Sequence, residues 1–324
     1  MGKSLIMINK NRLKIQKESV SPIIDFLNSE RPGFSGTNHV LIAIMLFFLL
    51  LMIPVEPFSS FLHAMTANGL LAILTFFIIC GAALLADMDL EMSGSGGGSY
   101  ATHTLGFLGS IISVTMVTMS SVMTSIFHGK RDVRPNTQHR FFWHTMLIPL
   151  VIFLLISFFA PENDNTVYES FMNNGFESSS VLIILLIGIC IYTGSILLLR
   201  KINKLSIIRI KPGMISTSLM ALTICLCIFC FTNTQVKFLG YCVALGYFFH
   251  LFADMFADGG IPALFPITGI FGRFWMRIKL SPLTVITGST VESLLKIVFA
   301  VIDVVLGYYV LAMYFNFLPK FWLY

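Results

Sequence analysis

Long apolar stretches constrain the fold of this chain more than any other feature. We place seven of them, each with a boundary uncertainty of several residues, at 40–56, 66–86, 144–160, 180–199, 215–232, 237–257 and 288–315. The 324 residues are 56% hydrophobic and only 11% charged, which lies outside the range of soluble domains. The sequence therefore predicts an all-α polytopic membrane protein with about seven transmembrane helices.

Lysine and arginine predict the orientation of these helices. Basic residues concentrate in the first 38 residues and in the loops 127–140, 200–211 and 272–280, whereas the loop 161–178 has acidic residues and no basic residue. The positive-inside rule places the N-terminus and the basic loops in the cytoplasm and the acidic loop outside.

The domain organisation that follows is simple. We expect a cytoplasmic basic segment over 1–38 and a single membrane domain over 39–324, because the apolar stretches are too closely spaced for a separate soluble domain. The formal net charge of +5 does not indicate a nucleic-acid partner, since no basic tract is interleaved with aromatic residues.

The stretch 104–127 is apolar in parts but rich in serine and threonine. If it crossed the bilayer, the basic loop 127–140 would change sides and the later charge pattern would invert. We therefore expect a helix that lies in the cytoplasmic interface or re-enters the membrane from it.

The sixth apolar stretch carries two ionisable residues near its C-terminal end. His250 and Asp254 are four residues apart, which places their side chains about 40° apart on one face of a helix. Ionisable groups in a membrane segment are costly and usually functional. The pair is either part of a metal site or a polar stripe sealed between helices.

More histidines and carboxylates fall near the predicted cytoplasmic ends of other helices. They are His39 before the first span, Asp87 and Asp89 after the second, His139 and His144 before the third, and Glu292 near the start of the seventh. Together with His250 and Asp254 they form a ligand set that suits zinc, manganese or iron, in a site of one to three metals. The alternative is that each is a boundary residue that prefers water.

The spacing within two of these pairs carries a further prediction. His139 and His144 are five residues apart, so one should precede the helix while the other lies in its first turns. Asp87 and Asp89 are two apart, which fits a helix end better than a helix interior.

Three residues are candidates for a catalytic role. Asp87 or Asp258 could accept a proton, although Asp258 could equally support a ligand or be one. Arg140 could hold a phosphate oxygen, or it could anchor the loop by the positive-inside rule.

The same residues resemble a known family. His139-Arg-Phe-Phe-Trp-His144-Thr resembles the His-Arg-Gly-x-x-His-Ser/Thr motif of the YdjM-type membrane-bound metal-dependent hydrolases, and Leu85-Ala-Asp87-Met-Asp89 is similar to their Pro-Asp-x-Asp motif. The stretch from Gly246 to Asp254, followed by Gly260-Ile-Pro262, is similar to a third motif. The resemblance implies an α-helical, zinc-dependent phosphoesterase in the bacterial cytoplasmic membrane, related to zinc-dependent phospholipase C and single-strand nucleases.

The chain departs from the family pattern at four positions. Ala86 stands in place of proline, Leu90 in place of a frequent histidine, Phe141 in place of glycine and Ala257 in place of a common threonine. The change at Leu90 matters most, because it could remove a ligand and with it one metal.

We expect an integral membrane hydrolase that cleaves a phosphoester of a lipid or lipid-linked substrate at the cytoplasmic face. One alternative is a metal-ion or solute transporter, although transport sites usually lie near the bilayer midplane and this chain shows no internal repeat. Another is a non-catalytic membrane effector or structural protein with a degenerate site. The sequence leaves the oligomeric state open.

Overall fold

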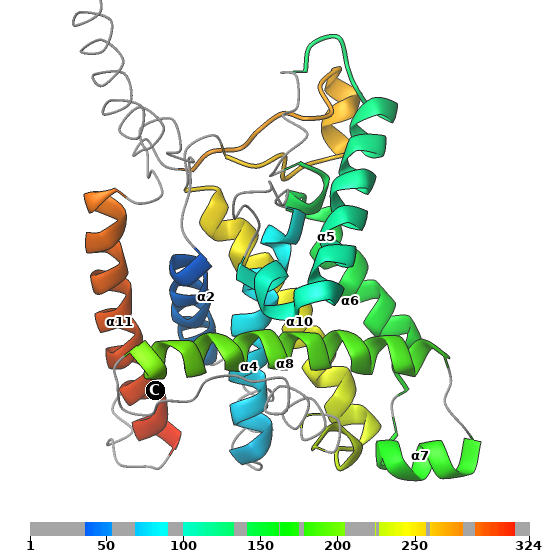
Figure 1. The fold of residues 1–324 in the computed structure, drawn as a ribbon, viewed down its shortest axis with the longest axis vertical. Coiled ribbons are helices and arrows are strands. Elements are labelled where there is room, and N and C mark those ends of the chain that lie inside the picture. The colour runs from blue at the N-terminus through cyan, green and yellow to red at the C-terminus, as the bar shows by residue number, and fades with distance from the viewer. Residues whose placement is uncertain are drawn as a thin grey trace, which may run out of the picture.

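The computed structural model describes residues 36–53, 69–89, 100–132, 141–161, 163–174, 178–204, 224, 227–256, 260–280 and 289–314. The elements in these ranges are α2 (Gly36–Leu51), α4 (Gly69–Leu85), η1 (Ala86–Asp89), α5 (Tyr100–Ile126), η2 (Phe142–His144), α6 (Leu147–Phe159), α7 (Val167–Asn174), α8 (Ser178–Lys204), α10 (Asn233–Asp254), η3 (Ile267–Phe271) and α11 (Thr290–Tyr314). Apart from these helices, the described ranges contain two isolated β-bridges. The all-α prediction is confirmed for this part of the chain (Figure 1).

Helix α4 lies at the centre of the bundle. It has no charged residue and packs against α2, α8 and α10, while α6 packs on α10 and α11 on α2. A helix that is apolar all round is expected to be buried in this way. Most of its buried apolar residues belong to the main hydrophobic core, which includes Phe47 of α2, Ile78 of α4 and Leu239 of α10.

Glycines let α8 and α10 approach α4 closely. A Cβ atom at Gly81 would overlap the carbonyl oxygen of Cys190, and one at Gly194 would overlap the carbonyl oxygen of Phe77. A Cβ at Gly246 of α10 would lie 2.8 Å from the carbonyl oxygen of Ile79. Small residues at helix contacts are typical of membrane bundles, where close backbone packing replaces the hydrophobic effect.

The structure supports a multi-pass membrane protein but not a count of seven spans. Within the described residues, four helices are long and apolar enough to cross a bilayer, over Gly69–Asp89, Phe107–Ile126, Asn233–Asp254 and Thr290–Ala312. Shorter apolar helices cover Gly36–Leu51, Leu147–Phe159 and Val181–Leu197. Most of the predicted span 215–232 lies outside the described residues.

Helix α8 does not run parallel to α4. Figure 1 shows α8 running across α4 rather than alongside it. Two helices that cross in this way cannot both run along the same bilayer normal.

Helix α5 contains the stretch that we expected at the interface. Its residues 107–126 are long and apolar enough to span, so length and composition do not distinguish the two arrangements. Several of its hydroxyl groups bond to their own helix: those of Thr115, Thr118, Ser121 and Ser125 each donate to the carbonyl four residues earlier. Such bonds hide the polarity of a hydroxyl from its surroundings.

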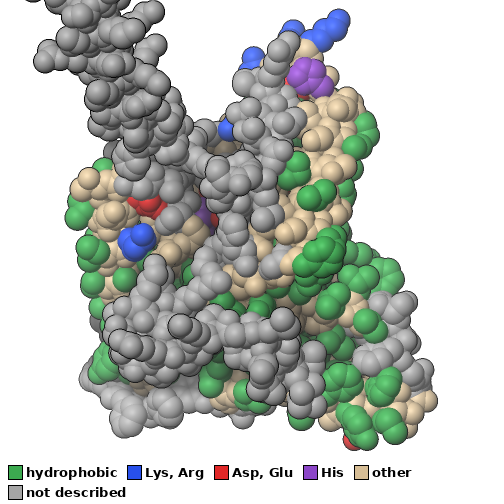
Figure 2. All heavy atoms as spheres, in the orientation of Figure 1, with side chains coloured by type: hydrophobic (Ala, Val, Ile, Leu, Met, Phe, Trp, Pro, Cys, Tyr) green, Lys and Arg blue, Asp and Glu red, His purple; other side chains and the backbone are tan. Residues whose placement is uncertain are grey.

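The outer helices expose apolar side chains. Val301, Val304 and Tyr308 of α11 are exposed, as are Leu150 and Phe158 of α6. Figure 2 shows hydrophobic side chains along the outer edges of the molecule where α11, α5 and α6 lie. Exposed apolar surface on this scale is expected of helices that face lipid.

Candidate metal centre

Four helical segments bring their ends together at one end of the bundle. His39 is the fourth residue of α2, Asp87 lies in η1 directly after α4, and His144 ends η2 just before α6. His250 and Asp254 lie in the last two turns of α10. Residues more than 200 positions apart in sequence therefore meet, as their shared position at predicted helix ends indicated.

Three ligand atoms from these segments have the mutual spacing of three corners of a tetrahedral metal site, and a fourth lies beside them. His144 Nε2, His250 Nε2 and Asp254 Oδ2 form a triangle in which each side is 3.3 Å. Asp87 Oδ1 lies 3.5 Å from His250 Nε2 and 3.9 Å from His144 Nε2. Ligands bound to zinc at about 2.0–2.1 Å in a tetrahedron are about 3.3–3.4 Å apart, so these side chains fit a metal with little rearrangement.

His39 lies beside these residues and could supply a further ligand. Its ring stacks on that of His250 with centroids 4.0 Å apart, and its Nε2 lies 3.5 Å from Asp254 Oδ1. One ligand atom each from His39, Asp87, His250 and Asp254 all lie within 4.8 Å of one another. Because the two oxygens of Asp254 face different histidines, this carboxylate could bridge two metals.

Two contacts outside the group orient the histidines. His250 Nδ1 lies 2.6 Å from the backbone oxygen of Ala83, which can only accept, so Nδ1 donates and Nε2 presents its lone pair to the cluster. His144 Nδ1 lies 3.3 Å from Asp89 Oδ2 and turns its own Nε2 inward. Metal-binding histidines in proteins are generally held by such carbonyl or carboxylate contacts.

The environment of the group is dry and acidic. The side chains of His39, His144, His250 and Asp254 have no exposed surface, whereas Asp87 is 15% exposed. Burial alone would lower the pKa of His144, but the carboxylates of Asp89, Asp254 and Asp87 outweigh it and raise this pKa well above its usual value. Several buried carboxylates so close together are unfavourable unless a cation lies among them.

The backbone around His144 is fixed by contacts that the sequence did not reveal. The hydroxyl of Tyr247 in α10 donates to the carbonyl of Trp143 at 2.8 Å, and the indole of Trp143 donates to the carbonyl of Met116 in α5 at 2.8 Å. Trp143 thus ties η2 to α5. The Met146 N–H donates to the carbonyl of Ala263 at 3.0 Å, which joins η2 to the loop after α10.

That loop contains the Gly260-Ile-Pro262 stretch and depends on its glycine. Gly260 has a φ of 56°, and a Cβ there would overlap the carbonyl oxygen of Ile278, with which Ile261 pairs. Phe141, where the family pattern has glycine, is buried against Trp275, and Arg277 lies 4.9 Å over its ring. The Phe141 ring is part of a hydrophobic cluster that also contains Trp275.

The structure refines the roles predicted for two pairs. Asp87 and Asp89 occupy a 3₁₀ turn at a helix end, as their spacing indicated, so Asp87 faces the group while Asp89 contacts the far side of the His144 ring. His144 ends the 3₁₀ helix η2 and does not lie in the first turns of α6. Helix α6 begins three residues later, at Leu147, where Pro149 falls in the first turn and its missing N–H leaves no helical bond unmade.

Glu292, in the first turn of α11, contacts the residue that precedes His39. Its Oε1 accepts from Asn38 Nδ2 at 2.9 Å, and Asn38 directly precedes His39 in α2. Three other predicted site residues, His139, Arg140 and Asp258, lie outside the described residues, as do Leu90 and Ala257.

Comparisons with family models, curated proteins and solved structures found no match to this chain. The likeness to the YdjM-type hydrolases therefore rests on the motif residues quoted above. What the structure adds to it is a group of His39, Asp87, His250 and Asp254 that could hold a metal, in which the last three residues come from those motifs.

Proposed function

We propose that this protein is an integral membrane, metal-dependent hydrolase that cleaves a phosphoester of a lipid or lipid-linked substrate. The observation that carries the proposal is the equal-sided triangle of His144 Nε2, His250 Nε2 and Asp254 Oδ2, with Asp87 beside it. Two histidines and one carboxylate are a ligand set of catalytic zinc sites, which keep one position open for water or substrate.

Asp87 supports a hydrolytic rather than a purely structural site. It is the member of the group with exposed surface, so a substrate would approach from its side. A metal held by His144, His250 and Asp254 would polarise a phosphoryl oxygen and lower the pKa of a water molecule. Asp87 Oδ1, 3.5 Å from His250 Nε2, is close enough to orient that water and accept its proton.

The position of the group supports a lipid headgroup as the substrate. Asp87 follows the apolar helix α4, and Asp254 ends α10, so both carboxylates lie where candidate spans end. Phosphates of lipids or lipid-linked sugars lie at that depth in a bilayer, and such a substrate could reach the site from within its leaflet.

Hydrolysis is tested with detergent-purified protein and a panel of phospholipids and polyprenyl-linked phosphates, by the release of phosphate or headgroup. We expect activity that EDTA abolishes and zinc or manganese restores, and that Asp87→Asn lowers by at least about 100-fold, the usual contribution of a proton acceptor. Asp303→Asn is the matched control, because Asp303 is also a buried carboxylate but belongs to α11. Metal-loaded protein that cleaves no member of the panel would refute the proposal for these substrates.

A second function, metal-ion transport, has one observation in its favour. Asp303 is 8% exposed on the apolar helix α11, and its oxygens accept no hydrogen bond from the described residues. It lies eleven residues after Glu292, which is about three turns along the same face. Zinc uptake into proteoliposomes that falls in Asp303→Asn, without any phosphoester cleavage, would favour transport.

A further inference from the structure

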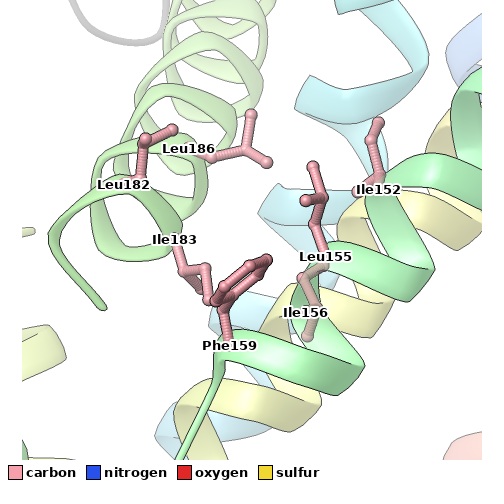
Figure 3. Close-up of a pocket in the computed structure, with 7 residues that line it drawn as sticks. All are labelled: Ile152, Leu155, Ile156, Phe159, Leu182, Ile183 and Leu186. Carbon is pink, nitrogen blue, oxygen red and sulfur yellow. The ribbon is translucent and has the colours of Figure 1, made fainter. Parts of the chain in front are cut away.

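An apolar groove lies between α6 and the first half of α8. Its cavity volume is about 300 Å³, at the lower end of the range for ligand pockets. Ile152, Leu155, Ile156 and Phe159 of α6 form one wall, and Leu182, Ile183 and Leu186 of α8 form the other. Figure 3 shows these side chains facing each other across the gap between the two helices.

The lining of the groove selects an alkyl chain. None of the seven side chains has a polar atom, so a ligand with hydrogen-bonding groups would lose its contacts with water and gain nothing in return. Leu155, Phe159 and Leu182 are also 48%, 53% and 69% exposed, which means that the groove opens to the surroundings of the helices. In a membrane those surroundings are hydrocarbon.

The innermost residues of the groove are held in place by packing in the protein core. Ile156 and Ile183 are buried in the main core, and Ile156 packs onto Gly240 of α10, where a Cβ would approach it to 3.0 Å. Helix α6 packs mainly on α10 and α8 mainly on α4. The two walls are thus held by different partners, which keeps the space between them open.

Helix α6 connects the groove to the candidate metal centre. It begins three residues after His144, and its groove-lining residues follow the helical spacing of one face. With a rise of about 1.5 Å per residue, Ile152 lies about 8 Å and Phe159 about 18 Å beyond the first residue of α6. The hydrocarbon of one leaflet is about 15 Å thick, half of a core of about 30 Å. A lipid with its phosphate at His144 and its chain along α6 would therefore reach the groove.

We propose that the groove between α6 and α8 holds an alkyl chain of the lipid whose phosphate is bound at the candidate metal centre. The inference rests on the proposed function, because it assigns the substrate's chain as well as its headgroup. It selects long-chain lipid phosphates over short-chain or water-soluble phosphoesters.

The test uses the full chain in detergent micelles and, as probe, a phosphatidic acid with a photoreactive diazirine near the end of one acyl chain. The protein is loaded with zinc, and the probe carries a non-hydrolysable phosphonate in place of its phosphoester, so that it is not consumed. Leu155→Trp and Leu182→Trp fill the groove from either wall. Leu154→Trp and Leu185→Trp are matched controls, since these leucines are exposed on the same two helices but do not line the groove.

We expect the groove variants to lose about tenfold in labelling of α6 and α8 at a fixed probe concentration, the weakening that follows when about two methylenes lose their burial. The controls should label like the wild type. Equal labelling of all four variants would overturn the inference, as would labelling that is no greater on α6 and α8 than on α11.

A kinetic readout separates this inference from the proposed function. In metal-loaded protein, the groove variants should raise the KM for a long-chain phosphatidic acid and leave turnover of its dioctanoyl analogue unchanged. Hydrolysis of both lipids with no difference between groove variants and controls would overturn the groove while the proposed function stands. Probe labelling that is lost in the groove variants, in a protein that hydrolyses neither lipid, would overturn the proposed function and the assignment of the chain to a substrate.

Discussion

Asp89 and His144 meet on the side of the imidazole ring that faces away from the candidate metal centre. Asp89 Oδ2 lies 3.3 Å from His144 Nδ1, while His144 Nε2 lies 3.3 Å from Asp254 Oδ2. A carboxylate behind a histidine fixes the orientation of the ring and makes its other nitrogen a stronger ligand. The contact explains why the two aspartates of one short turn have different roles.

The first prediction concerns this contact. Asp89→Asn should weaken metal binding by about 10–100-fold, the usual cost of losing such a partner, without abolishing it. Competition with a chelator of known affinity measures the change. If Asp89 were itself a ligand, the substitution would remove the metal at all accessible concentrations, and an unchanged affinity would contradict the orienting role.

Metal binding should weaken as the pH falls. The carboxylates around His144 raise its pKa despite burial, so this ring holds a proton below that raised pKa and must release it before Nε2 can bind a metal. Affinity should therefore rise with pH up to that pKa, by at most about tenfold per unit for each proton released, and then level off. Titrations at several pH values measure this, and an affinity independent of pH would contradict it.

Glu292 should support the site without binding the metal. Glu292→Gln keeps an oxygen that can accept from Asn38 Nδ2, so we expect metal content close to that of the wild type. Glu292→Ala removes that acceptor, leaves Asn38 Nδ2 only its longer contact of 3.4 Å with the backbone oxygen of residue 292, and should lower stability by about 1–3 kcal/mol. Loss of metal in the glutamine variant would identify Glu292 as a ligand instead.

The close contact between α4 and α8 predicts opposite effects at two glycines. Gly81→Ala would push a methyl group into the backbone of Cys190 and should cost about 1–3 kcal/mol or more. Gly188→Ala meets its nearest atom at 4.0 Å and should be neutral or stabilising by up to about 1 kcal/mol, because alanine favours helices. Thermal unfolding in detergent compares them, and equal melting temperatures would contradict the observed packing.

Much of the candidate site follows from sequence because helix geometry relates spacing to direction. The separation of four residues predicts that His250 and Asp254 share a face, and their oxygen and nitrogen are 3.3 Å apart. The boundary positions of His39 and Asp87 on separate helices predicted their convergence. Spacing could not show that Asp89 lies behind His144, because a 3₁₀ turn directs residues two apart to different sides.

The parts that sequence did not predict depend on the backbone. The carbonyls of Ala83 and Trp143 accept bonds that orient the site, and any residue type supplies such a group. The crossing of α8 over α4 depends on Gly81 and Gly194, which become informative only as a pair in contact. In α5 the number of serine and threonine residues overstated the polarity of the helix surface, because several of their hydroxyl groups bond to their own helix.

The most direct test of the account is the metal content of detergent-purified protein, measured by elemental mass spectrometry after loading and desalting. We expect about one to three zinc, manganese or iron ions per chain in the wild type and in Asp303→Asn, and none retained in His250→Ala/Asp254→Ala, which removes two corners of the ligand triangle. The same result with His250→Gln, which keeps most of the side-chain volume, would exclude misfolding as the cause. Wild-type protein without stoichiometric metal, or a double variant that retains it, would contradict the account.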